Sequence, residues 1–146
     1  MQVAGLMYLA TSAGSLVVSS TLQPIVNSTI SIVTSLSSSS DSHKSLEKTI
    51  ASIDLVASIK TIEAMILCMD CTHEPLKTAS ASVIEGIQKI NAILTKIADI
   101  TACHQRGYIS RWRTLDLSNE ITQIQDAMNV LNKRFTMLCD INSMKK

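Results

Sequence analysis

The chain has 146 residues and a formal net charge of +1. This length fits one domain that can bury most of its apolar surface, and the near-neutral charge gives no general attraction to nucleic acid or to an acidic surface. Aromatic residues make up only 3% of the chain, which has four Gly and two Pro, and a sheet protein would need more of all three. The composition predicts an all-α protein.

The first forty residues contain no ionisable side chain, and Asp41 is the first. Two apolar runs, 3–18 and 25–36, lie on either side of Pro24. They predict one helix over 3–20 and a second from Pro24 to about residue 36. A helix on the surface of a soluble protein normally carries a charged stripe. These helices are therefore either the buried part of a bundle or a segment that can enter a membrane.

Three amphipathic helices are predicted after a serine-rich linker over 37–42. The first covers 43–69, and its end at 65–69 is apolar all round, so we expect that end to be enclosed. The second covers 76–100, with apolar residues stepping by four and three from Val83 to Ile97. The third follows a cap at Asp116 or Ser118 and keeps the same spacing to Leu138. We therefore predict an antiparallel bundle of four to five helices in one domain, 1–146, with the uncharged pair in 1–40 and the amphipathic helices in 43–140.

No catalytic or metal-binding pattern stands out. Cys68 and Cys71, with Cys103-His104 further on, have the side chains that zinc prefers, but the CxxC pair lies on an apolar helix end and no second pair follows. Buried cysteines commonly act as small hydrophobic residues. With Cys139 they are expected to be free thiols in a reducing cytosol. Nucleophile–base sets and phosphate-binding loops are also missing, so we expect no enzyme activity, no metal and no cofactor.

A basic and aromatic cluster precedes the last helix and comprises Tyr108, Arg111, Trp112 and Arg113. One interpretation is a loop in which Trp112 covers the end of the bundle and the arginines are solvated. The other is a membrane-interface patch, where Trp and Tyr lie at the level of the headgroups and Arg meets anionic lipid. Three arginines without a wider basic face predict no nucleic-acid binding.

The segment GYISRWRTL at 107–115, followed by the isoleucine-rich helix EITQIQDAMNVLNKRF at 120–135, resembles the close of HeLo and HeLo-like domains. These domains include the N-terminal domains of fungal STAND receptors and are related to the four-helix bundle of the mixed-lineage-kinase-domain-like necroptosis protein. The opening VAGL at 3–6 is similar to their apolar N-terminal helix.

The resemblance implies a membrane-targeting, oligomerising domain of cell-death or immune signalling, held inactive as a soluble bundle in the cytoplasm and relocated to the plasma membrane on activation. Self-association, membrane lipids, and C-terminal sensor or effector domains or partner proteins would be its partners. The expected membrane-inserting residues are Val3, Leu6, Leu9, Ala10, Ala13, Gly14, Leu16 and Val17. The cluster Tyr108, Arg111, Trp112 and Arg113 would lie at the membrane interface.

Two alternatives remain open from the residues. The chain can be a protein–protein adaptor bundle without membrane activity, in which the N-terminal helix stays in the core. It can also be a secreted helical lipid carrier with two disulfides, although residues 1–10 lack the basic start of a secretory signal.

Overall fold

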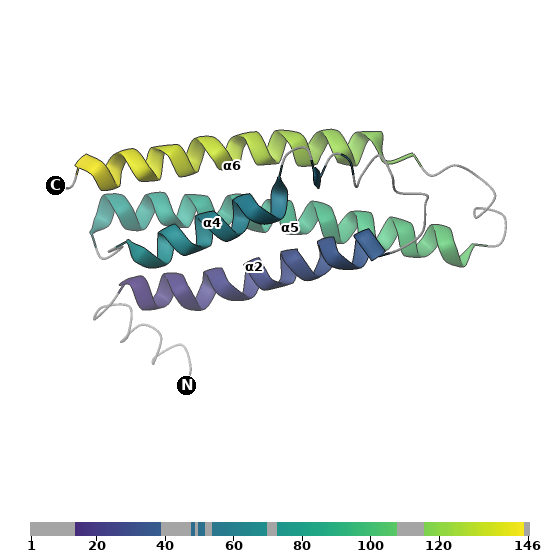
Figure 1. Cartoon of the computed structure of the whole chain (residues 1–146), viewed down its shortest axis with the longest axis horizontal. Helices are drawn as coiled ribbons and strands as arrows, with labels where there is room; N and C mark the ends of the chain where they lie inside the picture. Colours follow the sequence, from purple (N-terminus) through teal and green to yellow (C-terminus); the bar gives the residue numbers. More distant parts are fainter. Residues whose placement is uncertain are drawn as a thin grey trace.

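Four helices lie side by side in the part of the chain that the structure, a computed structural model, describes. The described residues are 14–38, 48, 50, 51, 54–69, 73–107 and 116–144, with residues 14–19, 37, 38 and 105 described by their backbone only. The helices are α2 (Gly14–Ser38), α4 (Leu55–Cys68), α5 (Glu74–Arg106) and α6 (Ser118–Met144). Helices α2 and α5 run in one direction and α4 and α6 in the other, so successive helices are antiparallel (Figure 1). The predicted all-α bundle is confirmed.

Helix α5 is the centre of the bundle, because it packs against both α6 and α2. Its predicted stripe is fully buried and consists of Val83, Ile87, Ile90, Leu94 and Ile97. Each such side chain contributes about 1.5–3 kcal/mol when it leaves water. Pro75 occupies the first turn, where its missing N–H costs nothing. The helix extends six residues beyond the predicted end at residue 100, to Arg106.

Helix α6 begins where its capping residues predict. The Asp116 carboxylate accepts hydrogen bonds from the backbone N–H of Ser118 at 3.0 Å and from the Ser118 hydroxyl at 2.7 Å. These hydrogen bonds hold the pKa of the Asp116 carboxyl below its ordinary value. Glu120 follows in the first turn, nearly buried, with its carboxylate 3.7 Å from the Lys96 ammonium of α5. An acid at this end is favoured by the helix dipole.

Helix α2 differs from the prediction, because one helix runs from Gly14 to Ser38 with Pro24 inside it. The predicted break at Pro24 is wrong. A proline removes one backbone hydrogen bond and usually disrupts a helix interior. Here Leu22 and Val26, on either side of Pro24, are both fully buried against the bundle, while Pro24 itself faces solvent. Tertiary packing on the core face therefore offsets the local cost of the proline.

The predicted continuous helix over 43–69 is also wrong. Asp54 has a left-handed backbone, with φ 52° and ψ 49°, and separates helical residues 48, 50 and 51 from α4. Its N–H donates to the Ala51 carbonyl at 3.1 Å, and its own carbonyl accepts from Ser58 at 2.9 Å to start α4. Asp is one of the few residues besides Gly that tolerate this conformation. The apolar spacing continues across the turn, which is why periodicity alone missed it.

Candidate functional site

The membrane residues predicted from the sequence lie outside the side chains that the structure describes. Val3, Leu6, Leu9, Ala10 and Ala13 precede the described residues, and Gly14, Leu16 and Val17 belong to the first turn of α2, where only the backbone is described. The predicted interface residues Tyr108, Arg111, Trp112 and Arg113 lie between α5 and α6, again outside the described residues. Both sets remain predictions.

Helix α2 combines a buried apolar face with an exposed face that carries no charge. Its core side chains include Leu22, Val26, Val33 and Leu36. The exposed residues are Ser20, Thr21, Gln23, Pro24, Asn27, Ser28, Ser31, Thr34 and Ser35. Among the described residues, no helix is long and apolar enough to cross a bilayer. Moving this face out of water would desolvate hydroxyls and amides, which costs much less than desolvating ions.

A polar layer joins α2 to α5 in the middle of their contact. Asn91 of α5 donates from its side-chain amide to the hydroxyl of Thr29 at 3.0 Å and to that of Ser28 at 3.1 Å. Thr29 is buried, and its hydroxyl donates to the Ile25 carbonyl at 2.7 Å. A polar contact inside an apolar helix interface fixes register at a cost in stability. These hydrogen bonds therefore help to fix the register of α2 against α5.

The cysteines do not converge on one site in the described structure. Cys68 ends α4, whereas Cys103 and His104 lie near the far end of α5, roughly 45 Å away along that helix at 1.5 Å per residue. Cys71 lies outside the described residues. The hairpin of α4 and α5 thus leaves Cys68 and Cys103 at opposite ends of the bundle. Cys68, Cys103 and Cys139 are free thiols, and no group of metal-ligating side chains occurs among the described residues.

Cys139 is half-buried on α6. Burial, and secondarily the negative charge of Asp140, raise the pKa of its thiol. Because the thiolate is the reactive form, Cys139 is a poor nucleophile at neutral pH.

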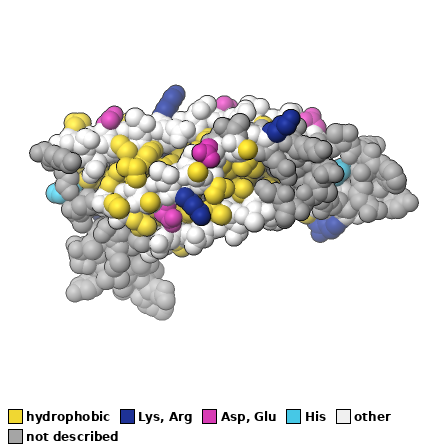
Figure 2. Space-filling view, viewed as in Figure 1, with side chains coloured by type: hydrophobic (Ala, Val, Ile, Leu, Met, Phe, Trp, Pro, Cys, Tyr) yellow, Lys and Arg dark blue, Asp and Glu magenta, His cyan; other side chains and the backbone are white. Residues whose placement is uncertain are grey.

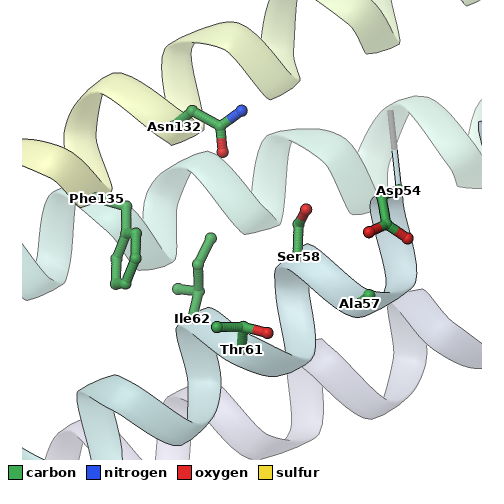
Figure 3. Close-up of a pocket in the computed structure, with 7 residues that line it drawn as sticks. All are labelled: Asp54, Ala57, Ser58, Thr61, Ile62, Asn132 and Phe135. Carbon is green, nitrogen blue, oxygen red and sulfur yellow. The ribbon is translucent and has the colours of Figure 1, made fainter. Parts of the chain in front are cut away.

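A cleft of about 220 Å³ opens between α4 and α6. Its polar lining groups are the Asp54 carboxylate, the Ser58 and Thr61 hydroxyls and the Asn132 amide, and Ala57, Ile62 and Phe135 complete the lining. Figure 3 shows the Phe135 ring pointing from α6 toward α4, and the Ser58 hydroxyl pointing toward α6. The cleft therefore offers a defined shape and hydrogen-bonding side chains from two helices.

The C-terminal end of α4 exposes large apolar side chains to solvent. The predicted enclosure of residues 65–69 is wrong, because Met65 is 42% exposed and Leu67 40% exposed, while Ile66 and Met69 are buried. Within α4 the only charged side chains are Lys60 and Glu63. In Figure 2 hydrophobic side chains gather over this part of the bundle, with few charged side chains among them. The last turns of α4 carry apolar side chains on both sides, but only one side packs against other described helices.

Helix α6 carries a second exposed apolar surface, which we call the α6 stripe: Val130, Met137 and Met144. Their side chains are 38%, 60% and 80% exposed. The three residues are separated by seven positions each, which places them on one line along the helix. They lie away from the buried stripe of α6, which contains Ile124, Met128, Leu131 and Leu138.

Sequence reasoning missed both apolar surfaces. The end of α4 was predicted to be core. Val130 and Met137 each directly precede a core leucine, so the core repeat concealed the α6 stripe. A signal was present for the α6 stripe, namely a repeat of seven that is offset from the core repeat. For the apolar end of α4, the sequence pattern could not show which side is buried, because that depends on which helices pack against it.

Comparison with protein-family models, with curated proteins and with solved structures finds no match to this chain.

Proposed function

We propose that this chain is a membrane-targeting, oligomerising signalling domain of HeLo-like type, which rests as a helical bundle in the cytoplasm. The observation that carries the proposal is the uncharged helix α2. It has no ionisable residue on either face, and it is bound to α5 partly through the polar contacts of Asn91 with Ser28 and Thr29. Such a helix can leave the bundle without exposing or burying a charge.

Release of α2 would carry residues 1–20 with it. The apolar residues expected to insert, such as Leu6 and Leu9, lie within eight residues of the start of α2 at Gly14. An element that is packed in one state and free in another is the kind of two-state device that switches use. In this mechanism the bundle holds the N-terminal segment until self-association favours the released state, and membrane perturbation in cell death or immune signalling follows from insertion.

A vesicle-leakage experiment tests the proposal with a charge placed on α2. Ser31 is exposed on α2, so Ser31→Glu leaves the resting bundle folded but opposes entry of that face into lipid. Gln88→Glu adds the same charge at an exposed position of α5 and is the matched control. We expect dye leakage from anionic vesicles with the full chain, reduced leakage with Ser31→Glu, and unchanged leakage with Gln88→Glu.

Deletion of residues 1–20 should remove leakage altogether. The proposal is wrong if the full chain causes no leakage under any oligomerising condition, or if the deletion variant and the full chain cause equal leakage. Circular dichroism of each variant checks that the helices are retained.

The second candidate function is an adaptor that binds a protein partner through its surface, with α2 staying in the core. The exposed Met65 and Leu67 on α4 favour it, since apolar side chains grouped on a surface with few charges commonly mark protein interaction sites. Under this function Ser31→Glu and Gln88→Glu would behave alike, and Met65→Glu would abolish partner binding without changing the fold.

A further inference from the structure

The α6 stripe lies beside two hollows, both formed between α5 and α6. Val130 borders a hollow of about 240 Å³ whose other lining residues include Lys89, Ile93 and Ala127. Met144 borders one of about 360 Å³, lined also by Pro75, Leu76 and Ile141. Met137 lies midway between Val130 and Met144 in the sequence, seven residues from each. The surface therefore has a projecting methionine at its centre and, at each end, an apolar residue beside a depression.

Charged side chains flank this surface in a pattern that is complementary to itself. Lys133 lies four residues before Met137, and Asp140 lies three residues after it. At 100° per residue, both fall on the same flank of the stripe. Both are exposed, and neither has an ion-pair partner within the described part of the chain. Arg134, by contrast, is engaged with α5, donating to the Ser82 carbonyl at 2.9 Å.

We propose that the α6 stripe is the interface of a homodimer, in which α6 helices of two copies pack antiparallel about a two-fold axis at Met137. In that arrangement the two Met137 side chains meet at the axis. Met144 of each copy lies opposite Val130 of the other, so that the most exposed methionine can enter the hollow beside Val130. A two-fold interface must be self-complementary, and this spacing fulfils that condition.

The charges agree with the same register. Counting outward from the axis, Lys133 of one copy comes within one residue of a position opposite Asp140 of the second copy. The two-fold axis repeats this contact. Two Lys133–Asp140 ion pairs, one from each direction, therefore lie on the same side of the paired methionines. In a parallel two-fold dimer the flank with Lys133 and Asp140 would lie on opposite sides of the interface in the two copies, so these charges would not meet. The charge pattern therefore selects the antiparallel dimer.

The interface is short, since Val130 and Met144 are about 21 Å apart along the helix at 1.5 Å per residue. An interface of this length lies at the small end of the range for specific complexes, so we expect a reversible dimer that depends on concentration. The inference rests on the proposed function in one respect: that function includes self-association, and the inference assigns the surface through which copies of the chain associate. It does not depend on whether α2 is released or whether any membrane is bound.

The first experiment compares the oligomeric state of two matched variants by sedimentation equilibrium of the full chain over a concentration series under reducing conditions. Met137→Glu places two carboxylates together at the axis and should weaken the dimer by about tenfold or more. Met65→Glu makes the same change at an exposed methionine of α4 and should leave the dimer unchanged. Both sites are exposed, so both variants should keep the helical circular dichroism of the parent chain.

The second experiment exchanges the two charges. Lys133→Glu and Asp140→Lys, each alone, bring like charges together and should weaken the dimer. The double variant Lys133→Glu/Asp140→Lys restores opposite charges across the axis and should recover the parent dissociation constant. Weakening by each single variant followed by recovery in the double variant is expected only for the antiparallel register, because in a parallel dimer Lys133 and Asp140 of the two copies do not meet.

Three results would overturn the inference: a chain that is monomeric at every concentration, equal weakening by Met137→Glu and Met65→Glu, or a double variant as weak as the single ones. If the chain is monomeric and Met137→Glu instead abolishes binding to anionic vesicles, the α6 stripe is a lipid-binding surface and the dimer is wrong. A dimer that behaves as expected while the full chain causes no leakage leaves this inference intact and refutes only the proposed function.

Discussion

At the scale of single residues, hydroxyl side chains inside the helices separate into satisfied and unsatisfied groups. The hydroxyls of Thr29, Thr95 and Thr122 each donate to the carbonyl four residues earlier. Thr101, near the end of α5, is buried, yet its hydroxyl oxygen has no hydrogen-bond partner in the described structure. A buried polar group without a partner keeps its full desolvation cost.

We therefore expect Thr101→Val to stabilise the fold, because it removes the unpaired hydroxyl with almost no change of shape. The free energy of unfolding should rise by about 1 kcal/mol. Thr29→Val is the matched control, since it deletes a buried hydroxyl that makes two hydrogen bonds, and it should lower the same quantity. Urea unfolding followed by circular dichroism measures both, and a Thr101→Val variant less stable than the parent chain would contradict the expectation.

At the scale of the helices, α5 and α6 approach each other closely at Gly86. A Cβ atom at this position would lie 3.1 Å from Cδ1 of Leu131 and 3.7 Å from its Cα. A glycine in the middle of a helix costs about 1 kcal/mol relative to alanine, so intrinsic propensity does not explain it. The close contact with α6 explains the glycine, because the Leu131 side chain occupies the space that a side chain at position 86 would need.

Gly86→Val is thus expected to destabilise the bundle by about 2 kcal/mol, the usual cost of forcing extra methyl groups into a packed interface. Ala92→Val, at an exposed position of the same helix, carries only the lower helix propensity of valine and is the control. The midpoints of urea unfolding compare the two. Equal midpoints would mean that α6 moves aside at no cost, and that the close approach at Gly86 is not needed for stability.

At the scale of the whole molecule, the bundle is tight on one side and open on the other. Helix α5 packs extensively on α6 and α2, whereas α4 has its most extensive contact with α2 and is separated from α6 by the cleft at Ser58 and Phe135. Helices with fewer packed neighbours open at lower free energy than the rest of a fold. The bundle therefore has a stable half, α5 with α6, and a more easily opened half that includes α4.

Native-state hydrogen exchange should reveal this difference. Amide protons in α4, such as that of Ile62, are expected to exchange through local openings of lower free energy than amides in the middle of α5, such as that of Ile90. Both side chains are buried, so accessibility of the residue itself does not explain a difference. Identical opening free energies for the two helices would indicate that the four helices open as one unit.

The fold class and most of the core could be predicted from the order of apolar and polar residues alone. The steps of four and three from Val83 to Ile97, and from Ile124 to Leu138 except for the half-buried Phe135, correspond to buried side chains because each helix needs one continuous apolar face. The start of α6 was also readable, since Asp116 caps it through local hydrogen bonds. These features depend on neighbours within a few residues, which the sequence supplies directly.

Tertiary packing determines that α2 continues through Pro24, where α4 begins, and which apolar side chains stay exposed among the described residues. Pro24 predicts a helix start, but the burial of Leu22 and Val26 keeps one helix through it. Met65, Met137 and Met144 are exposed because of how far α4 and α6 lie from the other helices. The residue pattern does not predict those distances. The candidate interaction surfaces can therefore be identified only from the packed helices. Whether an apolar side chain is core or exposed surface depends on whether a neighbouring helix covers it.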